Sequence, residues 1–420
     1  MLRDDVAVLN RLADAGVPPD GPPAWLAGLL RDDRGQVLPN LANAALALRE
    51  APELAGLLAF DEMSRLALLR RTVPGSRMAP VDQPRPMTDA DASALQEWLQ
   101  AHGLPRLGRE TTFQAAELVA RENAFHPVRD YLAGLRWDGV GRLRRWLTYY
   151  MGAEPTPYAA EIGRMVLVGL VARVMRPGCK ADHMLVLEGP QGAGKSTACA
   201  ILGAAWFSDS LPDLAGDQVR VSMHLRGKWL IEVAEMSALS RTETAALKAF
   251  LTRTEERFIP KYGRAEMVEP RQCLFVGTTN KEAYLRDETG GRRFWPVRVG
   301  RIDAEALAHD RDQLFAEAVV AWRAGAKWWP EGDFEREHIA PQQEARFEVD
   351  AWEAAIAEWL AGRDRTTSLE VARGALFVET PRLNTTDQRR IAAALERLGY
   401  VQRRDNKGRW WERREAAATP

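Results

Sequence analysis

The pattern of apolar and polar positions along the 420-residue chain predicts several globular units that differ in secondary structure. Short helical patterns such as Ala44 to Leu48 and Glu62 to Arg70 are separated by proline and glycine turns in the first part. We therefore predict a small helical N-terminal unit over residues 1–75. Residues 76–87 are rich in such breakers and are predicted to form a linker.

Helical periodicity continues from Thr88 to Met175 and predicts a helical domain over residues 88–180. Apolar strands then alternate with helices, which is typical of a parallel α/β core. The predicted strands are Met184 to Leu187, Trp229 to Val233, Leu274 to Thr278 and Phe294 to Val299. The predicted fold class is therefore α/β, with this core over residues 181–340.

The tail, residues 350–415, has a different pattern. It predicts three helices, Trp352 to Leu360, Ser368 to Phe377 and Thr385 to Leu398, and two short strands, Tyr400 to Arg404 and Arg409 to Glu412. The third helix is expected to open on a capping box formed by Thr385 and Gln388. Three helices followed by a two-stranded ribbon predict a winged-helix-like domain.

Composition restricts the protein class only broadly. Hydrophobic residues make up 46% of the chain, enough for two or three cores, and a formal net charge of −1 neither indicates nor excludes a polyanionic partner. Cys179, Cys199 and Cys273 lack metal-binding spacing, which argues against zinc and disulfides and favours a reducing, intracellular compartment. The most apolar stretch, Met165 to Val171, is too short to span a membrane, so no membrane partner is expected.

The segment from Gly189 to Ser196 fits the pattern of a phosphate-binding loop, and it lies between a predicted strand and a predicted helix. Glycines allow backbone N–H groups to surround phosphate oxygens, Lys195 can reach the β- and γ-phosphates, and the Ser196 hydroxyl can bind Mg²⁺. The sequence therefore predicts ATP and Mg²⁺ as cofactors. The predicted nucleotide-binding residues are Gly189, Pro190, Gln191, Gly192, Ala193, Gly194, Lys195, Ser196 and Thr197.

Two carboxylates, Glu232 and Glu235, lie near the end of the next apolar strand, where acids are needed to hold Mg²⁺ and polarise water. Glu235 is nearer the exposed end of the strand and is favoured as the catalytic acid and, with Ser196, as a metal ligand. Glu232 is the second candidate. Along an extended strand, the two acids would face opposite sides. An ordinary acidic turn is the alternative.

Two further candidates for the ATPase site are Asn280 and the pair of Arg292 and Arg293. Asn280 ends the strand that begins at Leu274 and is predicted to sense the γ-phosphate and orient the attacking water, although a simple turn is the alternative. Arg292 and Arg293 follow a glycine pair, and one of them is a candidate arginine finger that acts on a neighbouring subunit. As an isolated pair, such arginines are usually solvated or phosphate-binding side chains, which is the alternative.

Two groups of cations are predicted to contact DNA. A hairpin predicted around residues 257–268 carries Lys261, Tyr262 and Arg264 near its tip, which suits a phosphate backbone with a base stacked nearby. An exposed cationic turn is the alternative. In the tail, Arg389, Arg390 and Arg404 are predicted to contact DNA, with Arg397, Arg403, Lys407 and Arg409 nearby. A protein-binding winged helix is the alternative there.

The order of the motifs GPQGAGKST, WLIEVAEM, KYGR, GTTN and GGRRFWPV resembles the virulence-associated protein E family, whose ATPase domain is similar to superfamily 3 helicases. The resemblance extends from about Thr88 to Val299 and includes His126 to Leu132. It implies an AAA+ type P-loop core in a homo-hexameric ring, with the acids, sensor and trans-acting arginine as above. It also implies that Lys261 lies on a pore hairpin that touches DNA.

The combined expectation is an ATP-dependent DNA helicase or translocase that replicates a phage or another mobile element. It would act on single-stranded or forked DNA in the cytoplasm of a bacterial host, together with host or element-encoded replication proteins. One alternative is a nucleotide-controlled origin-binding initiator without unwinding activity. A small-molecule kinase is disfavoured, because the lid and acceptor pocket of a kinase are not visible in the sequence.

Overall fold

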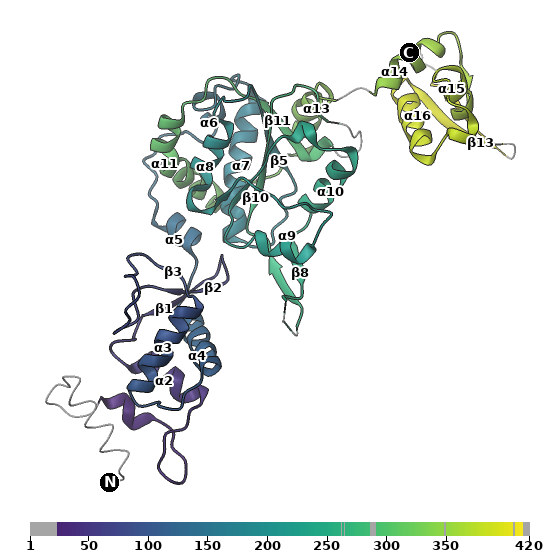
Figure 1. Ribbon diagram of the computed structural model, residues 1–420. Coiled ribbons are helices and arrows are strands. Elements are labelled where there is room, and N and C mark those ends of the chain that lie inside the picture. The colour runs from purple at the N-terminus through teal and green to yellow at the C-terminus, as the bar shows by residue number, and fades with distance from the viewer. Residues whose placement is uncertain are drawn as a thin grey trace. The chain divides into compact units, whose positions relative to one another are not determined.

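The structure is a computed structural model that describes residues 23–261, 263, 265–285, 291–347, 350–405 and 408–414 (Figure 1). The chain divides into two compact units. The first runs to Lys281 and resumes from Arg292 to Gln342, and the second contains the remaining described residues.

The N-terminal part of the first unit combines a four-stranded sheet with three helices. The strand order is β3-β2-β1-β4, in which β1 is antiparallel to β2 and parallel to β4. The elements are η1 (Ala24–Gly28), α2 (Leu41–Glu50), β1 (Leu58–Asp61), β2 (Leu66–Leu69), β3 (Arg85–Pro86), α3 (Asp89–Ala101), α4 (Arg109–Glu122) and β4 (Ala124–Phe125). Their buried side chains, from Trp25 to Ala120, form one core.

Two predictions for this region are wrong. The segment Glu62 to Arg70 contributes to an antiparallel hairpin instead of a helix. The reason is local, because Asp61 Oδ1 accepts hydrogen bonds from the backbone N–H groups of Met63 and Ser64 and so turns the chain. The predicted linker, residues 76–87, carries β3, and a single core holds residues from both sides of it.

The helices predicted between Thr88 and Met175 divide between two cores. Helices α3 and α4 belong to the N-terminal core, whereas α5 (Pro127–Gly134), α6 (Trp146–Tyr149) and α7 (Pro157–Met175) pack with the central sheet. Most of α7 is buried, which explains why its sequence is apolar on all sides. Within the described ranges, no helix has the length and apolar character needed to cross a membrane.

A five-stranded sheet forms the centre of the first unit, and its strand order is β11-β5-β10-β7-β6. Every neighbouring pair is parallel, which confirms the predicted α/β class with a parallel sheet. The strands are β5 (Met184–Glu188), β6 (Phe207–Ser208), β7 (Leu230–Val233), β10 (Leu274–Thr279) and β11 (Phe294–Arg298). Because the strands are parallel, their carboxyl ends meet at one edge, where ligands of such sheets bind.

Helices and short helical turns connect and cover these strands. They are α8 (Lys195–Gly203), η2 (Ala204–Trp206), α9 (Gln218–His224), η3 (Met236–Ala238), α10 (Arg241–Leu251), η4 (Gly291–Arg293), α11 (Ala304–Arg323), α12 (Gly332–Phe334), η5 (Glu335–Ile339) and α13 (Ala340–Glu344). Pro296 lies in β11, at the edge of the sheet, where a missing N–H does not interrupt the interior ladder.

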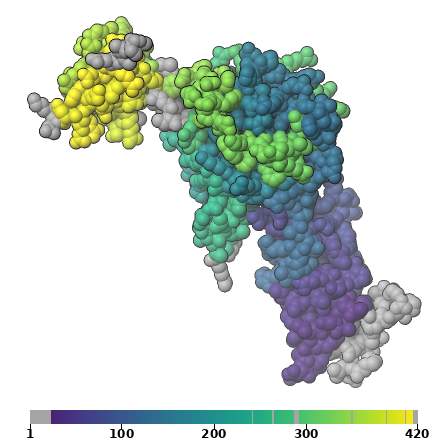
Figure 2. Space-filling model, turned by 180° about the vertical axis from the view of Figure 1, so that it is seen from behind, coloured from purple at the N-terminus to yellow at the C-terminus, as the bar shows by residue number. Residues whose placement is uncertain are grey.

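A separate two-stranded hairpin joins α10 to β10. Its strands, β8 (Glu255–Phe258) and β9 (Met267–Pro270), are antiparallel, as predicted from the sequence. The hairpin projects from the surface of its unit in both views (Figure 1, Figure 2). Tyr262 and Arg264, two of the predicted tip residues, lie outside the described residues.

The second unit contains three helices and a three-stranded antiparallel sheet of order β12-β14-β13. Its elements are α14 (Ala351–Trp359), β12 (Arg365–Thr366), α15 (Ser368–Gly374), η6 (Thr380–Arg382), α16 (Thr385–Arg397), β13 (Tyr400–Asp405) and β14 (Gly408–Arg413). Ile356, Val371, Ile391, Leu395 and Trp411 are among the buried residues of its core.

The predicted capping box of the third helix is wrong by one residue. The N-cap of α16 is Asn384, whose side chain accepts from the N–H of Asp387, and the Asp387 carboxylate accepts from the N–H of Asn384. Asparagine is among the best N-cap residues, and here its side chain takes the position predicted for Thr385.

Candidate active site

The loop from Gly189 to Lys195 connects the carboxyl end of β5 to the first turn of α8. Gly192 and Gly194 have φ angles of 79° and 91°, which only glycine adopts at low energy. A Cβ atom at Gly189 would lie 3.1 Å from Val299 Cγ2, so the neighbouring strand leaves little room for a side chain. The loop therefore forms a concave turn, and the amino end of α8 faces the inside of that turn. Such an arrangement of backbone N–H groups is suited to binding anions.

Lys195 is buried within this loop. Its Nζ donates hydrogen bonds to the carbonyl oxygens of Gly189 at 2.7 Å and Pro190 at 2.8 Å. Burial lowers the pKa of Lys195 from its ordinary value, and the nearby carboxylate of Glu232 opposes that shift. The ammonium group is thus held at the loop by two neutral acceptors, which charged phosphate oxygens can replace with stronger hydrogen bonds.

Glu232 is the acid that the fold brings to the phosphate loop. Its Oε1 accepts hydrogen bonds from Ser196 Oγ and Thr278 Oγ1, both at 2.7 Å. The side chain is only 1% exposed, and its Oε2 has no hydrogen-bond partner among the described residues. A hydroxyl beside a buried carboxylate provides two oxygen donors suited to Mg²⁺.

The described residues contain no cluster of three or more acids, histidines or cysteines that could hold a metal by themselves. A cation at Ser196 and Glu232 would therefore depend on other oxygen ligands. Mg²⁺ in phosphate-transfer sites commonly binds one or two carboxylates together with substrate phosphates and water. The residues present fit that arrangement.

Glu235, the acid favoured from the sequence, lies elsewhere. It is exposed, has a φ angle of 51°, and precedes the 3-10 helix η3 two residues after β7 ends. The contact with Ser196 is made by Glu232 instead, because Glu232 is still within the strand and points toward α8. The assignment of Glu235 as the partner of Ser196 is therefore corrected to Glu232.

Asn280 follows β10 at the same edge of the sheet. The carbonyl oxygen of Thr279 accepts a hydrogen bond from the N–H of Gly189 at 3.1 Å, which joins the end of β10 to the start of the loop. The exposed Asn280 is thus next to the phosphate loop, as a sensing residue requires. Thr278 was missed in the sequence, although a polar residue near the end of an apolar strand was a usable signal.

Arg292 and Arg293 lie at the opposite end of the strands, where β5 and β11 begin. They immediately precede β11, whose first residue, Phe294, pairs with Met184 at the start of β5. The five residues of β5 extend about 16 Å, so these arginines are about one strand length from the loop of their own chain. The two arginines are therefore remote from the phosphate loop of their own chain.

His183 lies close to these arginines. Its ring stacks on Trp295 with the ring centres 4.5 Å apart. Burial lowers its pKa to about 4, which the nearby arginines reinforce and Asp182 opposes. His183 is therefore a neutral, structural residue near neutral pH.

A model of the virulence-associated protein E-like domain matches residues 132–348, which is more than half of the chain. The chain belongs to the virulence-associated protein E-like family. The match includes the phosphate loop, both acids, the hairpin and the two arginines.

Two solved structures of the NrS-1 C-terminal region are similar to this chain. One has a TM-score of 0.47 and 11% sequence identity and covers 85% of this chain and 95% of its own. The other has a TM-score of 0.43 and 12% identity, with coverages of 81% and 85%. No curated protein sequence matches the chain.

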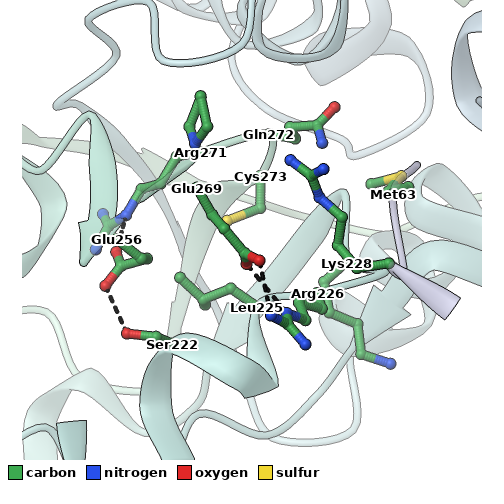
Figure 3. A pocket seen from close by; sticks show the side chains of 12 residues that line it. Met63, Ser222, Leu225, Arg226, Lys228, Glu256, Glu269, Arg271, Gln272 and Cys273 are labelled. Carbon is green, nitrogen blue, oxygen red and sulfur yellow. Dashed lines mark hydrogen bonds and ion pairs between the residues drawn. The ribbon is translucent and has the colours of Figure 1, made fainter. Parts of the chain in front are cut away.

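Within the virulence-associated protein E-like domain, the base of the β8–β9 hairpin is held by buried charges (Figure 3). Glu256 on β8 lies directly opposite Glu269 on β9, and both residues are buried. Arg271 Nε donates to Glu256 at 2.6 Å, and Arg226 donates to both carboxylate oxygens of Glu269 at 2.7 and 3.0 Å. Each arginine thus neutralises one of two carboxylates that would otherwise repel each other.

Arg271 also links the hairpin to its surroundings. Its NH1 group donates to the carbonyl oxygen of Phe250, at the end of α10, and its guanidinium lies 4.0 Å from the centre of the Phe250 ring. Arg271 is followed closely by β10, which ends beside the phosphate loop. The hairpin that carries the exposed Lys261 is therefore fixed rigidly to α10 and β10.

The C-terminal unit, from Asp350, lies outside the matched domain, and its predicted DNA-binding arginines differ in their surroundings. Arg389 and Arg404 are exposed. Arg390 instead donates to both carboxylate oxygens of Asp350 at 2.8 and 2.9 Å and stacks 3.6 Å from the Trp352 ring centre. Its assignment to DNA is corrected, because the ion pair fastens α16 to the start of α14.

Proposed function

We propose that this chain is an ATP-dependent, Mg²⁺-requiring DNA helicase or translocase that serves the replication of a phage or another mobile element. The observation that carries the proposal is the contact of Glu232 with Ser196 and Thr278, each at 2.7 Å. It joins the hydroxyl of a phosphate loop to a buried carboxylate at the carboxyl edge of a parallel sheet. Membership of the virulence-associated protein E-like family supports the same function.

In the proposed mechanism, Lys195 and the N–H groups of the loop would bind the phosphates of ATP, and Ser196 and Glu232 would hold Mg²⁺. When bound there, Mg²⁺ would supply charge neutralisation to the phosphates. Glu235, exposed beyond the end of β7, is the proposed acid that polarises the attacking water. Asn280 is the proposed residue that orients this water and senses the γ-phosphate.

The proposed oligomer is a homo-hexameric ring of AAA+ type. The position of Arg292 and Arg293 about one strand length from their own phosphate loop supports an action on the neighbouring subunit. An arginine supplied in this way stabilises the charge that develops during phosphoryl transfer. Hydrolysis would then depend on assembly.

The proposed DNA contacts lie on two elements. Lys261 near the tip of the β8–β9 hairpin suits the phosphate backbone of a single strand, and the rigid hairpin base suits a part that must transmit force. The C-terminal unit is proposed to be a winged helix, in which the exposed Arg389 and Arg404 contact DNA.

The test is ATP hydrolysis and unwinding by the purified full chain, with and without single-stranded DNA. We expect DNA to stimulate hydrolysis, and Lys195→Ala to reduce turnover at least about 100-fold by removing a charge from the phosphates. Lys327→Ala, at an exposed lysine paired with Glu331, is the matched control and should retain turnover.

Hydrolysis that does not respond to any nucleic acid would reject the helicase proposal. Stimulated hydrolysis without strand separation or translocation would instead favour a nucleotide-controlled initiator.

A further inference from the structure

Phe377 combines two unfavourable features in the connection between α15 and η6. Its side chain is 87% exposed, more than that of any other large hydrophobic residue described. Its φ angle is 54°, in the left-handed region that bulky residues rarely occupy. Neither feature is expected for a residue that only completes a loop.

The fold requires a left-handed residue at this position. Helix α15 is closed by a hydrogen bond from the N–H of Val378 to the carbonyl oxygen of Ala372, directly after Phe377. Leu376 and Val378, on either side, pack against the core of the unit. The chain must therefore reverse between them, and glycine or asparagine is the usual choice at such helix ends.

Among the described residues, the phenylalanine ring gains no contact that offsets the cost of this conformation. In the described part of the protein, the ring makes no stacked or cation–π contact. Glycine would relieve the backbone strain, and a polar residue would remove the exposed apolar surface. Within the described residues of its unit, the ring is thus left open to a binding partner.

We propose that Phe377 binds a nucleobase by stacking. This inference rests on the proposed DNA-binding role of the C-terminal unit. Exposed Arg382 ends η6, five residues after Phe377, and exposed Arg389 lies on α16. A protein-docking patch needs contiguous apolar surface, whereas the other large hydrophobic described as exposed in this unit is Leu369, at only 36%. A lone exposed aromatic ring on a unit that also carries exposed arginines suits a base of single-stranded DNA, which offers a flat face and a phosphate.

The experiment compares Phe377→Gly, Phe377→Trp and the full wild-type chain in binding a labelled single-stranded oligonucleotide across several salt concentrations. Phe377→Gly should weaken binding about tenfold, because it removes the ring on which a base can stack. Phe377→Trp should bind within about twofold of wild type, because it keeps an aromatic ring. The slope of binding against salt should not change in Phe377→Gly, since stacking neutralises no phosphate. Arg389→Gln should reduce that slope by about one.

Hydrogen exchange of α15 and α16 separates binding from folding. Phe377→Gly should retain or increase the protection of these helices, because glycine fits the left-handed backbone. Leu369→Ala, at the other exposed apolar side chain, is the control and should leave DNA binding unchanged.

Lost protection in Phe377→Gly would identify a structural residue and overturn the inference. Unchanged DNA binding by Phe377→Gly, beside a wild-type chain that binds, would overturn it without affecting the proposed function. A wild-type chain that binds no DNA would overturn both.

Discussion

At the scale of single residues, the two oxygens of Glu232 have different surroundings. One accepts two hydroxyl hydrogen bonds, and the other is buried with no hydrogen-bond partner in the described residues. A buried carboxylate oxygen without a partner is unfavourable unless a cation or another donor completes the site. Thr278, from the neighbouring strand, keeps the carboxylate oriented toward Ser196.

Replacing Thr278 by valine should therefore weaken the proposed Mg²⁺ site. The shape is conserved, but Glu232 loses one of the donors that orient it, and the loss of such an outer partner commonly weakens metal binding 10- to 100-fold. We expect Thr278→Val to raise the Mg²⁺ concentration for half-maximal ATP hydrolysis about tenfold. Thr279→Val, one residue further along β10, is the comparison. An unchanged Mg²⁺ requirement would contradict this role of Thr278.

His183 should make the fold sensitive to acid. Its pKa is lowered to about 4 in the folded chain, whereas an unfolded histidine titrates near 6.5. Stability is thus fully present above about pH 6.5 and is lost as the pH falls toward 4, by roughly 1 kcal/mol at pH 5.5. We expect His183→Phe, which keeps the stacking on Trp295, to reduce the loss of melting temperature between pH 7.5 and 5.5. An equal loss in both proteins would exclude His183 as the cause.

At the scale of elements, the β8–β9 hairpin would be weak by itself, since two isolated strands are marginally stable in water. Its base is stabilised instead by two ion pairs. Glu269 pairs with Arg226 of the connection between α9 and β7, and Glu256 pairs with Arg271 of the segment before β10. Ser222 of α9 adds a hydrogen bond to Glu256 at 3.0 Å. The hairpin's direction is therefore set by its neighbours.

The Arg271–Glu256 pair should behave as a buried ion pair in a double-mutant cycle. Arg271→Met alone leaves a buried carboxylate without its main partner and should destabilise the chain by about 3–5 kcal/mol. Adding Glu256→Leu should recover most of that loss, because apolar side chains can replace a buried pair. Chemical denaturation measures both. Arg257→Gln, on the exposed face of the same hairpin, should leave the denaturation midpoint nearly unchanged, because water screens exposed ion pairs. A double variant as unstable as the single one would contradict the pairing.

At the scale of the whole molecule, the separation of Arg292 and Arg293 from the phosphate loop makes the proposed site incomplete within one chain. The two ends of β5 place the loop and the arginines at opposite edges of the sheet. In the proposed ring of identical chains, two subunits would therefore complete each site.

Mixing two inactive variants tests this prediction. Lys195→Ala should disable the phosphate loop, and the double change Arg292→Ala with Arg293→Ala should disable the trans-acting group. Equal mixing should restore about one quarter of the interfaces, because random assembly leaves that share with both parts intact. ATP hydrolysis after mixing is the measurement. No recovery, despite mixed oligomers of normal size, would contradict a shared site.

The local sequence was sufficient for features that depend on neighbouring residues. The phosphate loop, the parallel strands around it, the β8–β9 hairpin and the C-terminal ribbon follow from glycine spacing, apolar periodicity and turn residues. It failed where a local interaction competed with periodicity, as at Asp61, whose side chain turned a predicted helix into a hairpin. Helical spacing alone contains no information about that hydrogen bond.

Only the tertiary structure decided which side chains from distant segments meet. Glu232 rather than Glu235 contacts Ser196. Arg390 pairs with Asp350, although the two residues are far from each other in the sequence. The physical reason is that strand order and helix packing set these contacts, and neither is encoded by the spacing of residues within one element. The sequence alone predicted the phosphate loop, whereas the fold decided which acid contacts its serine.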